Sequence, residues 1–107
     1  MLFKETSVFT RRLASILDDD EYRELQVDLV KKPDAGKEIK QSGGIRKLRW
    51  SAKGRGKRGG CRIIYYWIIS KEQILFLYVY GKNEQEDLTA DQIKALKRVV
   101  ELELKGV

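Results

Sequence analysis

Apolar residues recur every three or four positions near the start of the chain, which is the spacing of one helical face. This pattern covers residues 9–17. Asp18, followed three residues later by Glu21, predicts an N-cap with a capping box and therefore the start of a second helix. Pro33 ends that helix, because proline lacks the N–H that a helix interior requires. The first third of the chain is predicted to hold two helices after a short strand at residues 2–6.

Further along, the apolar pattern changes to the two-residue period of strands. The predicted strands are 45–50, 61–69 and 74–80, the last two joined by a hairpin turn. Thr89 and Gln92 then predict a second capping box, which opens a helix that runs to about residue 105. This order of elements is typical of an α+β fold. A small, mainly antiparallel sheet is expected, with two N-terminal helices and one C-terminal helix covering one of its faces.

Length and composition limit the possible classes. With 107 residues the chain forms one domain, residues 1–107. The longest apolar run, 63–69, is too short for a transmembrane helix, and no signal peptide is expected. Cys61 is the chain's one cysteine and no histidine is present, so neither a disulfide nor a zinc site is predicted. We expect a cytoplasmic protein that has no cofactor, no metal and no membrane partner.

Positive charge is concentrated in one segment. The net charge is +6, yet residues 39–71 contain ten Lys/Arg and no Asp/Glu, while the rest of the chain has 12 basic and 16 acidic residues. Segregation of one sign costs stability through self-repulsion. The segment therefore indicates a polyanionic partner, with nucleic acid the best chemical fit. The alternative is a loop that only increases solubility.

The glycines of this segment fit a nucleotide motif by coincidence. Residues 54–59 read G-x-G-x-x-G, but a dinucleotide site needs a helix after the motif and a strand follows here. A Walker loop needs Ser or Thr after Gly-Lys, and Arg58 follows Lys57. Both nucleotide-binding interpretations are therefore rejected.

Alternation within the strands predicts a cluster of cations. Lys47 and Arg49 share one face of their strand, and Arg62 begins the next strand. We expect the three to converge on the open face of the sheet, with Tyr80 and Lys82 completing the cluster. Further RNA contacts are predicted from Arg46, Lys53, Arg55, Lys57 and Arg58.

Such a site suits cleavage of RNA by attack of its own 2′-hydroxyl. Arginines would neutralise the crowded phosphorane, and in the absence of His a lysine held neutral by neighbouring cations would be the base. Lys47 is the first candidate, with Lys53, Lys57 or Lys82 as alternatives. The competing interpretation is phosphate binding without catalysis.

Two stretches of the chain resemble a known family. GGIRKLRWSAKGRGKRGGCRIIYYW and LYVYGKNEQEDLTADQIKAL are similar to the RelE/HigB superfamily of bacterial toxins, and especially to its HigB-like branch. The resemblance implies a RelE-like fold and a toxin of a type II toxin–antitoxin system. Such a toxin enters the ribosome, cleaves mRNA there without a metal and so inhibits translation. Its partners would be the ribosome, mRNA and a cognate antitoxin, expected to be a small helix-turn-helix protein.

The resemblance also implies roles for individual residues. Lys47 and Arg49 match basic strand residues of the RelE active site, Arg62 matches a phosphate-stabilising arginine, and Lys82 matches a basic residue after the last strand. At Asn83 the pattern departs from RelE, which has a second basic residue there, and the C-terminal helix lacks the stacking tyrosine of RelE. The proton-transfer roles therefore carry over less well than the class of chemistry.

Two other function classes stay open at this point. One is a non-catalytic RNA- or DNA-binding module that uses the same basic segment. The other is a protein-interaction domain that binds an acidic partner. For a toxin, the antitoxin could lay acidic residues over the cations. The interpretation we favour is that it docks on the helical side, around Tyr22, Leu29 or the final helix, and leaves Arg62 accessible.

Overall fold

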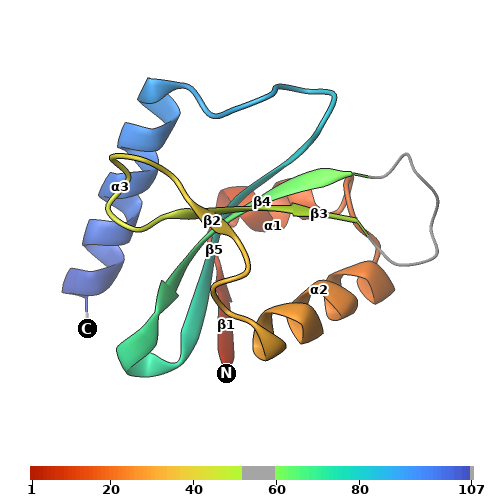
Figure 1. Ribbon diagram of the computed structural model, residues 1–107, viewed down its shortest axis with the longest axis horizontal. Coiled ribbons are helices and arrows are strands. Elements are labelled where there is room, and N and C mark those ends of the chain that lie inside the picture. The colour runs from red at the N-terminus through yellow and green to blue at the C-terminus, as the bar shows by residue number, and fades with distance from the viewer. Residues whose placement is uncertain (52–59, 107) are drawn as a thin grey trace.

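A computed structural model describes residues 1–51 and 60–106 (Figure 1). The elements, in chain order, are β1 (Leu2–Glu5), α1 (Ser7–Leu13), α2 (Asp19–Lys31), β2 (Lys37–Glu38), β3 (Arg46–Trp50), β4 (Cys61–Ile68), the 3-10 turn η1 (Ile69–Lys71), β5 (Gln73–Gly81) and α3 (Ala90–Lys105). The predicted α+β architecture is confirmed. No helix in the described ranges is long and apolar enough to cross a membrane.

Both predicted capping boxes are present. The Glu21 amide donates to Asp18 Oδ1 at 2.8 Å, and the Asp18 amide donates to Glu21 Oε1 at 2.8 Å. At the start of α3, the Gln92 amide donates to Thr89 Oγ1 at 3.1 Å and the Thr89 amide to Gln92 Oε1 at 2.9 Å. These reciprocal bonds satisfy amides that would otherwise lack a partner at a helix N-terminus. They fix the point at which the chain enters each helix.

The five strands form one sheet in the order β1-β5-β4-β3-β2. Strands β3, β4 and β5 are antiparallel neighbours, and β2 pairs antiparallel with β3. The opening strand β1 pairs parallel with β5 at one edge. The two-residue strand β2 was not predicted, because Lys37 and Glu38 are both polar and show no alternation.

Helices cover both faces of the sheet, which corrects the expectation that they share one. On one face α1 and α2 enclose a core with the side chains of Cys61, Ile63 and Tyr65. On the other face Val100 of α3 packs with Ile64. Figure 1 shows α3 apart from α2, on the other side of the sheet. The reason is that β4 and β5 are apolar on both faces, so both faces need cover.

Candidate functional site

The pairing of β3 with β4 brings three predicted cations together. Arg49 lies directly opposite Arg62, and Lys47 lies opposite Ile64. Since alternate residues of a strand share a face, Lys47, Arg49 and Arg62 lie on the same face of the sheet. This is the face on which α3 packs against Ile64. The expected juxtaposition is present, on a face that α3 covers in part.

The fourth predicted catalytic residue, Lys82, borders the same surface. Its backbone amide donates to the carbonyl of Gly60 at 3.2 Å. A Cβ added to Gly60 would lie 3.2 Å from Lys82 Cδ and 3.9 Å from Arg62 Nη1. Glycine at this position therefore leaves room for both side chains. Together we call Lys47, Arg49, Arg62 and Lys82 the cation cluster.

Within this cluster, Arg62 has few internal partners. Its Nε is buried and makes no hydrogen bond within the described ranges. Nη1 makes a long contact of 3.4 Å to the carbonyl of Cys61. No ion pair between Arg62 and an acidic side chain occurs in residues 1–51 and 60–106. A half-buried guanidinium with this environment retains charge that an anion can neutralise.

An acidic side chain that the sequence did not single out lies against the cluster. Asp87, in the segment between β5 and α3, forms an ion pair and hydrogen bond with Lys47. The hydrogen bond from Lys47 and its charge lower the pKa of the Asp87 carboxyl, and Arg49 and Arg62 lower it further. In the sequence, Asp87 is marked only by its position two residues before the helix cap at Thr89. That position does not indicate where the side chain lies.

The segment that carries Asp87 is fixed at both ends. Glu84 Oε2 accepts from the Gly81 amide at 2.7 Å, and Arg12 of α1 pairs with the same carboxylate. The Gln85 amide group donates to the carbonyl of Asp87 at 2.7 Å and to Gln92 Oε1 at 2.9 Å. These bonds connect the turn after β5 to the capping box of α3. They hold the backbone of Asp87 in place beside the cations.

Next to the cluster, the surface is hollowed. A depression of about 540 Å³ is lined by Ala35, Lys37, Lys47, Leu48 and Arg49. It lies where β2 pairs with only two residues of β3. Basic side chains around an open concave surface are suited to a segment of a phosphodiester chain.

Two predicted RNA contacts have a different setting in the structure. Arg46 lies opposite Tyr65, on the face that carries α1 and α2, and donates to the carbonyl of Gly36 at 2.8 Å. It braces the segment before β2 and is not part of the cation cluster. Tyr80 pairs with Arg62 across β4–β5 but is 0% exposed. Because α3 and its neighbours cover the ring, Tyr80 presents no surface on which a base could stack.

The remaining predicted RNA contacts lie outside the described residues. These are Lys53, Arg55, Lys57 and Arg58, within residues 52–59. Cys61 is a core residue, as the sequence predicted, and burial raises the pKa of its thiol to about 11. No group of three or more His, Cys, Asp or Glu that could hold a metal ion occurs in the described part of the chain.

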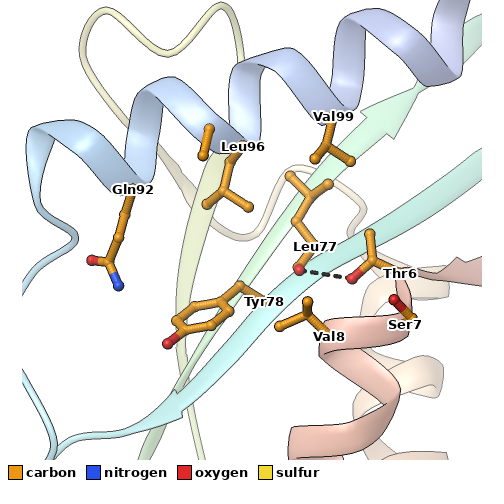
Figure 2. A pocket seen from close by; sticks show the side chains of 9 residues that line it. Thr6, Ser7, Val8, Leu77, Tyr78, Gln92, Leu96 and Val99 are labelled. Carbon is orange, nitrogen blue, oxygen red and sulfur yellow. Dashed lines mark hydrogen bonds between the residues drawn. The ribbon is translucent and has the colours of Figure 1, made fainter.

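A second concave surface has different chemistry. An apolar groove lies between the start of α1 and one face of α3, with Leu77 and Tyr78 of β5 between them (Figure 2). Its volume is about 430 Å³. No charged residue lines it. This groove is therefore suited to apolar contacts and not to phosphate binding.

The fold of this chain is similar to those of two solved structures. In the solved structures, a double arginine-to-alanine mutant of E. coli toxin RelE in the free state matches with a TM-score of 0.55 and 14% identity, over 79% of this chain and 86% of that one. A chain of the intact E. coli RelBE toxin–antitoxin complex matches with a TM-score of 0.55 and 14% identity, over 75% of this chain and 94% of that one. These likenesses show the fold.

The family follows from a comparison of sequence. The sequence model described as the RelE toxin of the RelE/RelB toxin–antitoxin system matches residues 6–105. That match includes both capping boxes, the whole cation cluster and Asp87. The chain therefore belongs to the RelE family of toxins from toxin–antitoxin systems.

Proposed function

We propose that this toxin is an endoribonuclease that cleaves mRNA on the ribosome, in the cytoplasm, and thereby inhibits translation. The observation that carries the proposal is the β3–β4 register, which sets Arg49 opposite Arg62 with Lys47 on the same face. Two guanidinium groups side by side can bind a phosphodiester and neutralise the charge of its phosphorane. Lys47 and Lys82 add positive charge and groups that can transfer protons.

The proposed reaction is attack of the 2′-hydroxyl on the adjacent phosphorus, without a metal. It yields a 2′,3′-cyclic phosphate and a free 5′-hydroxyl. Residues 52–59, with four cations, would hold ribosomal RNA and message beside the cluster. The depression next to Lys47 and Arg49 would receive the mRNA nucleotides that flank the cut.

Primer extension on an mRNA translated in vitro, with and without the protein, tests this proposal. We expect new 5′ ends within codons that ribosomes occupy, and no such ends on the same mRNA without ribosomes. Ribosome or RNA binding without any cut would favour the non-catalytic RNA-binding module instead. Binding to an acidic protein alone would favour the interaction domain.

We further propose that a cognate antitoxin neutralises the toxin by binding the apolar groove between α1 and α3. The side chains of Val8 and Val99 are each 37% exposed and line this groove (Figure 2). An apolar segment of the antitoxin could bury them while the cation cluster stays uncovered. Leu29, one of the contacts expected from the sequence, is a residue of α2 whose side chain is fully buried in the core, so it offers no docking surface. A helix-turn-helix class for the antitoxin stays a prediction.

A further inference from the structure

Asp87 differs from the other acidic residues in its setting. Its carboxylate pairs with Lys47, and Arg49 and Arg62 are near enough to help lower its pKa. The Asp87 side chain is 72% exposed, whereas the Lys47 side chain is 21% exposed. A substrate can therefore reach the carboxylate from solvent, while the lysine is held between it and the sheet.

The fold orients Asp87 from several directions. The Gln85 side chain bonds the Asp87 carbonyl and Gln92, and the capping box at Thr89 fixes the chain two residues later. Such bonding reduces the freedom of a group before substrate arrives, which is what a reacting group requires.

We propose that Asp87 is the general base that accepts the proton of the attacking 2′-hydroxyl. This inference rests on the proposed function and assigns one of its proton transfers. The chain has no His, and a lysine must lose its own proton before it can accept one. A carboxylate beside three cations is ionised at neutral pH, so it can accept a proton without that prior step. The same cations make it a weaker base, so the assignment rests on its position beside Lys47 and its exposure to substrate.

The chemical step balances with the groups present. The oxygen of the 2′-hydroxyl bonds to phosphorus while its proton passes to an Asp87 carboxylate oxygen. The P–O5′ bond breaks, and the leaving oxygen takes a proton from the Lys47 ammonium. Asp87 then holds one extra proton and Lys47 lacks one. Their direct hydrogen bond lets the proton return, which restores the site for another turnover.

Two other roles for Asp87 predict different behaviour. As an internal competitor for the phosphate site, it would slow cleavage, so its removal would raise the rate. As a positioning residue for Lys47, it would act only on protonation of the leaving group. The three roles are therefore separable by which bond change becomes slow when the carboxylate is lost.

The first test uses Asp87→Asn in the full-length protein, with single-turnover cleavage of ribosome-bound mRNA as the readout. The matched control is Glu86→Gln, which removes one negative charge at the adjacent exposed position. We expect Asp87→Asn to slow cleavage by about 10²- to 10⁴-fold with unchanged ribosome binding, and Glu86→Gln to cleave at the wild-type rate. Asp87→Glu, which retains a carboxylate, should cleave faster than Asp87→Asn. Wild-type or faster cleavage by Asp87→Asn, or no advantage of Glu over Asn, overturns the inference.

The second test uses an mRNA with sulfur in place of the leaving 5′-oxygen at the cut, because sulfur leaves without being protonated. Asp87→Asn should stay slow on this substrate, whereas a Lys47→Ala variant should regain much of its rate. Recovery of Asp87→Asn would show that Asp87 acts on the leaving group and would overturn its role as base. The wild-type protein distinguishes failure of the proposed function from failure of this inference. If it does not cleave ordinary ribosome-bound mRNA, the proposed function is wrong. If it does cleave, but the Asp87 variants do not behave as expected, only the role of Asp87 is wrong.

Discussion

Arg49 and Arg62 are direct partners across the antiparallel pair β3–β4. Like charges placed opposite one another destabilise a sheet, so this pair costs the free protein stability. Asp87 relieves part of the repulsion from outside the sheet, through its pair with Lys47 and its proximity to both arginines. A bound phosphate would relieve more, because it can accept hydrogen bonds from both guanidinium groups at once. The arrangement therefore suits the anion binding that we propose.

Substitution of Arg62 separates function from folding. We expect Arg62→Ala to abolish growth arrest on induced expression and to slow cleavage about 10²- to 10³-fold, the usual cost of losing one transition-state donor. Its melting temperature should not fall, because the substitution also removes the repulsion from Arg49. Growth curves, cleavage rates and thermal melts measure this. Arg98→Ala is the control, since Arg98 lies on α3 with its side chain 65% exposed. A folded Arg62→Ala protein with full toxicity would exclude Arg62 from the site.

Salt dependence tests whether the cations are the RNA contact. Each phosphate contact on single-stranded RNA releases counterions, so the log–log slope of affinity against salt should be roughly −0.7 per contact. We expect Arg49→Ala to reduce the magnitude of the slope by about that amount. Titrations of RNA binding at several salt concentrations give the slope. An affinity that barely changes between low and physiological salt would mean that another surface binds RNA.

The sequence predicted those parts of the site that depend on local structure, and it missed the part that depends on contacts between residues far apart in the chain. The positions of Lys47 and Arg49 on one face follow from strand alternation, which is local. Their alignment with Arg62 needed only the pairing of two adjacent strands. Asp87 could not be found this way, because a loop residue has no periodicity that gives its direction. The position of Asp87 depends on contacts between segments that are distant in sequence, such as the ion pair between Glu84 and Arg12.

The position of α3 was missed for a related reason. Its capping box at Thr89 is visible in the sequence, but the box does not say which face of the sheet the helix covers. That choice depends on the apolar residues that β4 and β5 carry on both faces, one of which is covered by α1 and α2 and the other by α3. Tyr80 was expected to complete the cluster from the end of the last strand. It does pair with Arg62, but its ring is buried in the core under α3, which the sequence did not show.

Two substitutions test the structural role of Tyr80. Because its ring is fully buried in the core under α3, Tyr80→Ala should destabilise the protein by about 3–5 kcal/mol. The hydroxyl contacts the Glu86 carbonyl at 3.5 Å, the outer limit of a hydrogen bond, so Tyr80→Phe should preserve stability and cleavage. Urea unfolding and cleavage rates measure both effects. A loss of cleavage in a stable Tyr80→Phe protein would show that the hydroxyl meets the substrate after all.

The environment of the Glu84 carboxylate should make the stability of the folded protein depend on pH. Its pKa is lowered from the ordinary value of 4.5 by the Gly81 amide and by Arg12. A carboxyl with a lower pKa in the folded state stabilises the protein above its unfolded pKa, and this contribution is lost as the pH falls through the folded value. Glu84→Gln should therefore lower the melting temperature at neutral pH and match the wild type in strong acid. Thermal melts across this range, with Glu86→Gln as control, are the measurement. An equal difference at both ends of the range would mean that the charge of Glu84 is not responsible.

The proposed antitoxin site predicts which exposed valine, when replaced by a charged residue, prevents neutralisation. If an apolar antitoxin segment fills the groove between α1 and α3, Val99→Glu should prevent neutralisation while cleavage by the free toxin stays normal, because a charge in an apolar contact must be desolvated. The control is Val27→Glu: Val27 is also an exposed helix valine, 47% exposed, but it lies on α2. Pull-down of the antitoxin and rescue of growth measure both variants. In the complex, Arg62 should remain as accessible as in the free toxin. Loss of neutralisation by Val27→Glu instead, or an antitoxin carboxylate within hydrogen-bond distance of the Arg62 guanidinium, would place the antitoxin elsewhere.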